Sequence, residues 1–266
     1  MKNHFIFSYV GNKRGEVEKI YENINFDNIE TIVEPFCGSC ALSYYIWSLN
    51  KDKNYKYVLN DLDPSLIDLI LLIKNGNIDS INDNINKLVD DIKEIDEALE
   101  AKKKYIDTIK NNGIYGYYIK YKYYSITAGL FPINIYKKMK KTEIEKTPFY
   151  DFLKNANVEI TCGDGVKIIK KYDNNKCFLF LDPPYLQSQN GSYNNNTGDN
   201  MDNIYEYLIK IKLFNLKSKT LICHENNWLF NILFKEYFYG DCEYYKKYEK
   251  SNKKKTSHIL ARNYEM

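Results

Sequence analysis

The chain has 266 residues, 44% of them hydrophobic, which suits one α/β domain with a smaller insert. Its 38 basic and 35 acidic residues leave a net charge of +3, which permits a polyanionic partner without indicating one. No apolar run approaches membrane-spanning length, no signal peptide is visible and the six cysteines are scattered, so we expect a reduced, cytoplasmic protein.

The first part of the chain alternates buried strands with helices. A Gly-Ser turn separates the first strand from its helix, and Pro64 is well placed to begin the second helix. The alternation is typical of a parallel α/β sheet. The expected elements are a strand at 31–34, a helix at 41–49, a strand at 57–60 that ends at Asp61, and a helix at 66–73.

This alternation stops near residue 76. A stripe of apolar residues then repeats at steps of four and three, which predicts one amphipathic helix packed on the domain by that stripe; the repeat is too short to demand a coiled-coil partner. The stripe consists of Ile81, Ile85, Leu88, Ile92, Ile95 and Leu99. Residues 114–141 follow, rich in Tyr and Lys. We therefore predict a helical insert at 76–156 within a main domain formed by 1–75 and 157–266.

The sheet is expected to resume after the insert and to end in a hairpin. A polar segment rich in Asn, Gly and Ser interrupts it and is predicted to be a mobile loop. The expected elements are strands at 158–161, 177–181 and 220–224, helices at 202–214 and 228–234, the loop at 187–200, and a hairpin at 244–261 with its turn at 251–254.

The strongest chemical signal is Asp182-Pro183-Pro184-Tyr185, directly after the most strand-like run of the chain. Two prolines make a rigid corner with exposed carbonyls at the carboxyl end of a strand, where α/β sheets place their active sites. Direct methylation of an aryl amine needs hydrogen bonds from its N–H groups to a carboxylate and a carbonyl, which Asp182 and Pro183 could accept, and a ring such as Tyr185 on which the base could stack. The alternative is a Pro-Pro turn with a chance Asp and Tyr.

Two earlier segments suit a bound nucleotide-like ligand. The turn at Gly38 lets backbone approach a ligand closely and aims a helix N-terminus at it, although the full glycine-rich fingerprint is missing. Asp61, at the end of the second strand, is placed to bind ribose hydroxyls. The alternative for Asp61 is a helix cap ahead of Pro64.

Together these motifs resemble the Dam-like DNA adenine-N6 methyltransferases, the alpha-type amino-methyltransferases with a DPPY motif. The resemblance covers nearly the whole chain, with the insert matching least. It implies a Rossmann-like S-adenosylmethionine-dependent methyltransferase sheet with a helical target-recognition insert. The similar segments are Tyr9-Val10-Gly11-Asn12-Lys13, Glu34-Pro35-Phe36-Cys37-Gly38, Asn60-Asp61, Gly163-Asp164, Asp182-Pro183-Pro184-Tyr185, the strand at 222–226 and the hairpin at 251–263.

The resemblance implies a role for each matched residue. The catalytic residues would be Asp182, Pro183, Pro184 and Tyr185. S-adenosylmethionine would be bound by Tyr9, Gly11, Lys13, Glu34, Pro35, Phe36, Cys37, Gly38, Asp61, Asp164 and Asp182. Three departures bear on this assignment: Asn12 replaces a Gly, Ser39 and Cys40 replace glycines, and Ser8 replaces a basic residue that can help read the target, so a GATC target is not carried over.

The partner implied is double-stranded DNA, with the target adenine flipped out of the duplex and a separately encoded cognate restriction endonuclease as a possible companion. Asn134 could pair with an adenine edge, in a loop or turn at 124–135. Lys137, Lys138, Lys253 and Lys254 could contact phosphates, or could simply be a solvated face. No metal is expected, since Cys37 and Cys40 have no second pair at metal spacing.

Three alternatives stay open at this point. The first is the same chemistry on cytosine N4 or on adenine in RNA, although Asp at position 182 favours adenine. The second is a protein-glutamine methyltransferase, which would more often carry Asn there and would not need the insert. The third is a non-catalytic DNA-binding relic of the fold, against which Asp61 and Asp182 argue.

Overall fold

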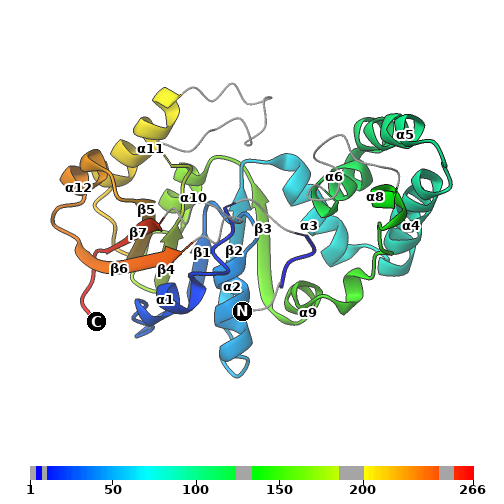
Figure 1. The fold of residues 1–266 in the computed structure, drawn as a ribbon. Coiled ribbons are helices and arrows are strands. Elements are labelled where there is room, and N and C mark those ends of the chain that lie inside the picture. The colour runs from blue at the N-terminus through cyan, green and yellow to red at the C-terminus, as the bar shows by residue number, and fades with distance from the viewer. Residues whose placement is uncertain (1–3, 8–10, 124–133, 186–200, 246–254) are drawn as a thin grey trace. The chain divides into compact units, whose positions relative to one another are not determined.

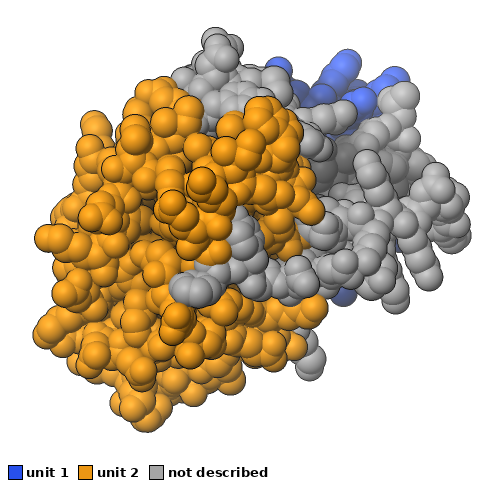
Figure 2. Space-filling model, turned by 90° about the vertical axis from the view of Figure 1, so that its left-hand side faces the viewer, with its two compact units in different colours: residues 1–12, 65–155 blue, residues 13–64, 156–266 orange. Residues whose placement is uncertain are grey.

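The computed structural model describes residues 4–7, 11–123, 134–185, 201–245 and 255–266. The chain divides into two compact units, coloured separately in Figure 2. The helical unit consists of residues 1–12 and 65–155, and the sheet unit of residues 13–64 and 156–266. Residues 65–75 and 1–12, which the sequence analysis placed with the main domain, thus belong to the helical unit.

The sheet unit is built on a seven-stranded sheet in the order β3-β2-β1-β4-β5-β7-β6 (Figure 1). Neighbouring pairs from β3 to β5 are parallel, whereas β7 runs antiparallel to both β5 and β6. This confirms the Rossmann-like class. The strands are β1 (Thr31–Glu34), β2 (Lys56–Asp61), β3 (Asn157–Cys162), β4 (Cys177–Leu181), β5 (Lys219–Glu225), β6 (Phe238–Tyr245) and β7 (Lys255–Arg262).

The strand order reverses beside β1, which lies between β2 and β4. Val33 of β1 is in register with Val58 on one side and Leu179 on the other. Because crossovers between parallel strands are right-handed, the chain leaves β1 over one face of the sheet and returns to β4 over the other. The carboxyl ends of β1 and β4 therefore border the crevice at the switch point, which is where open α/β sheets bind their ligands.

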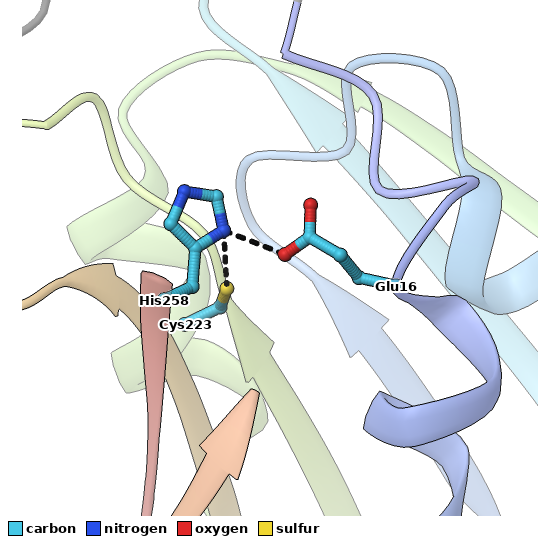
Figure 3. Close-up of side chains that lie close together, drawn as sticks. All are labelled: Glu16, Cys223 and His258. Atoms are coloured by element: carbon cyan, nitrogen blue, oxygen red, sulfur yellow. Dashed lines mark hydrogen bonds and ion pairs between the residues drawn. The ribbon is translucent and has the colours of Figure 1, made fainter. Parts of the chain in front are cut away.

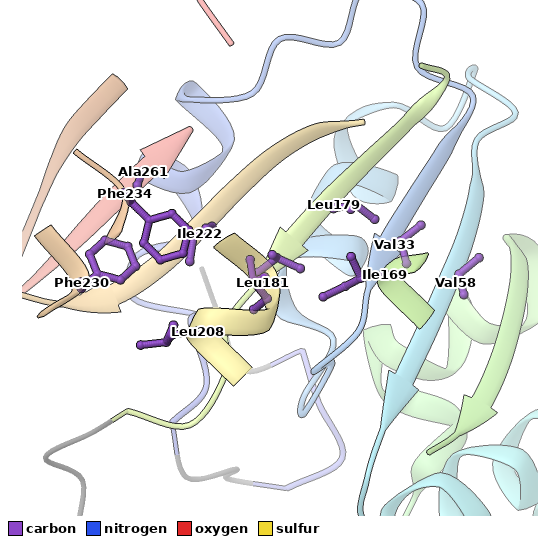
Figure 4. Close-up of a cluster of buried hydrophobic side chains, with 11 residues drawn as sticks. Val33, Val58, Ile169, Leu179, Leu181, Leu208, Ile222, Phe230, Phe234 and Ala261 are labelled. Atoms are coloured by element: carbon purple, nitrogen blue, oxygen red, sulfur yellow. The ribbon is translucent and has the colours of Figure 1, made fainter. Parts of the chain in front are cut away.

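One face of the sheet is covered by the helices α10 (Gly165–Tyr172), α11 (Met201–Leu213) and α12 (Trp228–Leu233). Their apolar side chains pack on the strands in one buried cluster (Figure 4). Burying each large apolar side chain contributes about 1.5–3 kcal/mol, so this cluster fixes the strands whose ends carry the polar residues. The cluster comprises Val33, Val58, Ile169, Leu179, Leu181, Leu208, Ile211, Ile222, Phe230, Phe234 and Ala261.

The helices α1 (Val17–Glu22) and α2 (Ala41–Leu49) pack against each other on the opposite face (Figures 1 and 4).

The helical unit contains α3 (Pro64–Asn75), α4 (Ile78–Lys93), α5 (Ala98–Asn111), α6 (Gly113–Lys122), α8 (Asn134–Lys137), the 3₁₀ turn η1 (Ile144–Lys146) and α9 (Pro148–Asn155). Asn86 of α4 exchanges hydrogen bonds with the backbone of Thr142, donating at 3.2 Å and accepting at 2.6 Å. The backbone N–H of Phe149 donates to the carbonyl of His4 at 3.0 Å, which ties the first residues to this unit. Among the described residues, no helix is both long and apolar enough to cross a membrane.

The single long helix predicted from Ile81 to Leu99 is wrong. The helix α4 ends at Lys93, and the carboxylate of Glu97 caps the next helix by accepting from the N–H of Glu100 at 2.9 Å. Leu99, the last residue of the apolar repeat, lies in α5 and is 61% exposed, so the repeat extends beyond the end of α4. A side-chain cap satisfies orphan N–H groups and restarts the helix in a new direction.

Two further expectations need correction. Asn134 was placed in a loop or turn, but it begins the short helix α8, and residues 124–133 lie outside the described residues. The terminal hairpin was expected from residue 244, but β6 already begins at Phe238. Its predicted turn at 251–254, and the predicted loop at 187–200, lie outside the described residues.

Candidate active site

The corner that follows β4 holds a compact group of polar side chains. The Asp182 carboxylate forms an ion pair through Oδ2 with the Lys13 ammonium, and its Oδ1 accepts a hydrogen bond from the Tyr185 hydroxyl at 2.9 Å. The Lys13 side chain is 7% exposed and that of Asp182 16%. Burial lowers the pKa of Lys13, but the charge and hydrogen bond of Asp182 act together with the nearby Cys223 and Glu16 to raise that pKa above the ordinary value of 10.5, so the ammonium stays protonated.

The Tyr185 ring is enclosed by side chains from several elements. The ring centroids of His224 and His258 lie 5.0 and 4.9 Å from its own, and the Lys13 Nζ lies 5.2 Å from its centroid. Its hydroxyl is also 3.5 Å from the Cys223 Sγ. Burial, reinforced by the charge of Asp182, raises the pKa of Tyr185 well above 10.0. The phenol therefore stays neutral and can donate a hydrogen bond.

Sequence reasoning missed the two histidines, because neither has a partner at a recognisable spacing. His258 lies on β7 opposite Glu225 of β5, so strand pairing carries it to the corner that follows β4. Its Nδ1 lies 2.6 Å from the Glu16 carboxylate and 3.9 Å from the Cys223 Sγ (Figure 3). The resulting group of Glu16, Cys223 and His258 is buried.

His224 supports the same corner from β5. Its ring stacks on Phe230 with a centroid distance of 4.9 Å and an interplanar angle of 5°. Its Nδ1 lies 3.0 Å from the carbonyl oxygen of Glu225, which fixes the ring in the sheet. Burial lowers the pKa of His224 below the ordinary value of 6.5, so the ring is neutral near pH 7.

The loop after β1 is held in place by the buried side chain of Glu34. Glu34 is 3% exposed, and its carboxylate accepts a hydrogen bond of 2.7 Å from the N–H of Ser43 in the first turn of α2. Burial raises the pKa of Glu34 from 4.5 to about 7, and the Ser43 hydrogen bond offsets part of that rise. Glu34, predicted to bind the cofactor, therefore holds the helix that begins beside the loop.

The next strand closes this loop with Asp61 and Asn60. Asp61 accepts from the N–H of Gly38 at 2.9 Å and from the N–H of Asp63 at 3.1 Å. Burial raises the pKa of Asp61 above 3.8, and these backbone hydrogen bonds oppose the rise. The buried Asn60 amide donates to the carbonyls of Pro35 at 2.9 Å and Gly163 at 2.8 Å, so the loops after β1 and β3 are fixed to the end of β2.

Asp164 and Phe36 complete this edge of the sheet. Asp164 caps α10 by accepting from the N–H of Val166 at 2.9 Å. Gly165 leaves room for Phe36, because a Cβ at position 165 would lie 2.7 Å from the Phe36 ring. The structure thus gathers the predicted residues from Glu34 to Gly38, Asp61 and Asp164 at the carboxyl ends of adjacent parallel strands.

These residues fit S-adenosylmethionine. The chemistry available is a half-buried carboxylate for ribose hydroxyls, a second carboxylate at the next strand end, an aromatic ring and a glycine turn through which backbone can approach a ligand. Although both oxygens of Asp61 accept backbone N–H groups, a carboxylate offers about four lone-pair positions and keeps some for a ligand. Cys37, 4% exposed, lies below this surface.

The remaining predicted residues are only partly placed: Tyr9 and Gly11 were predicted to bind the cofactor, and the lysines to contact DNA. Lys137 is exposed and pairs with the Asp96 carboxylate at 2.9 Å, and Lys138 is exposed in the turn directly after the short helix α8. Gly11 has a φ of 77°, which suits glycine. Tyr9, Lys253 and Lys254 lie outside the described residues.

A mostly parallel sheet with this strand order, carrying an Asp-Pro-Pro-Tyr corner at its switch point, defines a Rossmann-like S-adenosylmethionine-dependent methyltransferase. Residues 9–253 match the sequence profile of the D12 class N6 adenine-specific DNA methyltransferases. The chain belongs to this family. Its reaction is therefore methyl transfer from S-adenosylmethionine to adenine N6 in DNA.

Two kinds of relative accompany the family match. The chain is 27% identical over 188 residues to the type II methyltransferase M.CviBI of Paramecium bursaria Chlorella virus NC1A, an alignment that covers 68% of each protein. Among solved structures, it is similar to the rRNA methyltransferase aviRa from Streptomyces viridochromogenes, solved at 2.4 and 1.5 Å. In both cases the identity is 10% and the coverage is 98% of this chain and 90% of the other, with TM-scores of 0.38 and 0.39.

Proposed function

We propose that the chain methylates one adenine within a specific site of double-stranded DNA, and that it flips this base into the corner formed by Asp182, Pro183, Pro184 and Tyr185. The observation that carries the proposal is the Asp182 carboxylate, held at the carboxyl end of β4 by Lys13 and Tyr185. Flipping is required because an adenine stacked inside the duplex cannot present its amine to a carboxylate within the enzyme's corner.

The corner acts on the amine through hydrogen bonds. The lone pair of an aryl amine is delocalised into the ring, so the amine is a poor nucleophile. Donation of its two N–H groups to the Asp182 carboxylate and the Pro183 carbonyl localises that pair on nitrogen, and these acceptors are rigid before the base arrives. Bound S-adenosylmethionine supplies an electrophilic methyl group. The amine loses one proton in the reaction, and Asp182 is placed to accept it.

Lys13 has a different role from the one that the resemblance implied. Its ammonium pairs with Asp182, so we assign it to the catalytic corner and not to cofactor binding. A carboxylate can accept from Lys13 and from an adenine amine at the same time. We therefore assign Lys13 and Tyr185 to orienting the Asp182 carboxylate toward the incoming amine.

The cofactor is assigned to the neighbouring edge. We assign ribose binding to Asp61, further polar contacts to Asp164, and packing to Phe36 at the Gly38 turn, since these groups lie at the ends of adjacent strands. Glu34 and Asn60 act behind them by holding the loops in place. Nothing in this arrangement calls for a metal ion.

Sequence reading is assigned to the helical unit, which the sheet does not need for closure. Asn134 would contact a base edge, and Lys137, Lys138, Lys253 and Lys254 would contact phosphates. The similarity to a type II methyltransferase supports a cognate restriction endonuclease, encoded separately. Because such an enzyme acts on cellular DNA, we assign the protein to the cytoplasm of a bacterial cell or of a cell that hosts a phage or virus.

The test is to sequence single DNA molecules from cells that express the parent chain or the Asp182→Ala variant. The parent should leave N6-methyladenine within one recurring motif, and the variant should leave none at matched expression. Methylation of cytosine instead, or normal methylation by the variant, would contradict the proposal.

A further inference from the structure

A closed circuit of contacts encloses the catalytic corner. Asp182 contacts both Lys13 and Tyr185, and the Tyr185 ring packs edge-on against His258, with an interplanar angle of 77°. His258 bonds to the Glu16 carboxylate at 2.6 Å. The backbone N–H of Glu16 donates to the carbonyl of Lys13 at 2.9 Å, which returns the circuit to its start.

The far side of this circuit is deeply buried. Glu16 is 3% exposed and His258 6%, and each would be costly to bury alone. Glu16 precedes α1 and makes no side-chain cap to that helix. Its carboxylate is committed instead to a histidine on the last strand, 242 residues away in the chain.

A second interpretation is a metal site, since Glu16, Cys223 and His258 offer oxygen, sulfur and nitrogen ligand atoms within 4.8 Å of one another. The 2.6 Å separation between Glu16 and His258 is that of a direct hydrogen bond, so these two ligand atoms are already used on each other. The geometry favours a direct pair, and metal binding becomes an outcome of the test.

We propose that Glu16 and His258 are positioning residues that hold the Tyr185 ring in place for capture of the flipped adenine. The inference rests on the proposed function, in which the adenine is flipped into the corner that includes Tyr185. The near-perpendicular His258 ring restricts rotation of the Tyr185 ring, and the hydrogen bond to Glu16 holds the His258 ring in place. Because the turn from Lys13 to Glu16 is one hydrogen-bonded unit, the same pair also steadies the ammonium that orients Asp182.

The test uses variants that distinguish the role of the His258 ring from that of its hydrogen bond to Glu16. His258→Gln keeps a side-chain donor for Glu16 but removes the aromatic edge, so kcat should fall roughly ten- to a hundredfold, the scale for small displacements in an active site. Glu16→Gln keeps an oxygen acceptor for Nδ1 and should stay within about threefold of the parent, whereas Glu16→Ala should behave like His258→Gln. The DNA dissociation constant, and stabilisation by S-adenosylhomocysteine, should change little in each variant.

The matched control is Asp173→Ala. Asp173 accepts from the N–H groups of Lys217 and Ser218 at 2.8 and 2.9 Å, ahead of β5 and therefore at the amino end of that strand, away from the corner. This variant should lose stability but keep the parent's kcat. An equal loss of kcat in the control, or a parental kcat in both His258→Gln and Glu16→Ala, would overturn the positioning role.

Two further experiments show whether a negative result contradicts the proposed function or only the positioning role. If Asp182→Ala keeps its turnover, the proposed function fails; if it is inactive while His258→Gln and Glu16→Ala are normal, only the positioning role fails. Dialysis of the parent against a chelator should leave kcat unchanged. A loss of activity that added Zn²⁺ restores would replace the direct pair with a metal site.

Discussion

Gly165→Ala tests how tightly the cofactor edge is packed. A Cβ at position 165 would lie 2.7 Å from the Phe36 ring and 3.0 Å from the Pro35 carbonyl oxygen, so the loop after β1 must shift. Overpacking of this kind costs about 1–3 kcal/mol. Because Phe36 is half-buried and can yield toward solvent, we expect the cost to appear mainly as lost cofactor affinity.

The expected loss of ligand-induced stabilisation follows from the linkage between binding and folding. S-adenosylhomocysteine at a hundred times its dissociation constant should stabilise the parent by about 2.7 kcal/mol. A loss of about 1.4 kcal/mol in affinity is tenfold, and at the same ligand concentration it halves that stabilisation to about 1.4 kcal/mol. The assay is the thermal shift with and without ligand, converted to free energy, together with direct titration.

The control is Gly15→Ala, because a Cβ at position 15 would meet nothing within 4 Å. Gly15→Ala should keep the parent's dissociation constant and the full ligand shift. If Gly165→Ala binds S-adenosylhomocysteine as tightly as this control does, then the contact with Phe36 does not shape the cofactor site and the reasoning above fails.

Three other outcomes are expected. Asp61→Ala should largely abolish the stabilisation by S-adenosylhomocysteine, and an unchanged shift would remove Asp61 from the cofactor site. Since the folded-state pKa of Glu34 is raised from 4.5 to about 7, its contribution to stability is full below the lower value and is lost as pH rises through the higher one. Glu34→Gln should therefore flatten the fall in stability across that window, measured by urea unfolding at several pH values. Lys137→Ala combined with Lys138→Ala should weaken binding to all DNA sequences alike and lower the salt slope by up to about two units, and a sequence-dependent loss would refute simple phosphate contact.

The sequence by itself determined most of the sheet and the polar ends of its strands. Buried strands read as short apolar runs, and a polar residue directly after such a run must lie at a strand end. Asp61 and Asp182 could therefore be assigned to one edge before any coordinates, since parallel strands share their carboxyl edge, whereas Asp164 was indicated only by the family resemblance. Such strand ends can be predicted because they depend only on the sequence of the strand and not on which strands pair.

The tertiary structure decided which of these groups touch. Lys13 meets Asp182 across 169 residues, and Glu16 meets His258 across 242. The second contact forms because β7 inserts beside β5 and carries His258 to the corner. No spacing in the sequence encodes such a pair, since it depends on the order of strands and not on a repeat. The break between α4 and α5, by contrast, has a local cause. The apolar stripe continues through it in the sequence, but the Glu97 side chain caps a new helix at that point.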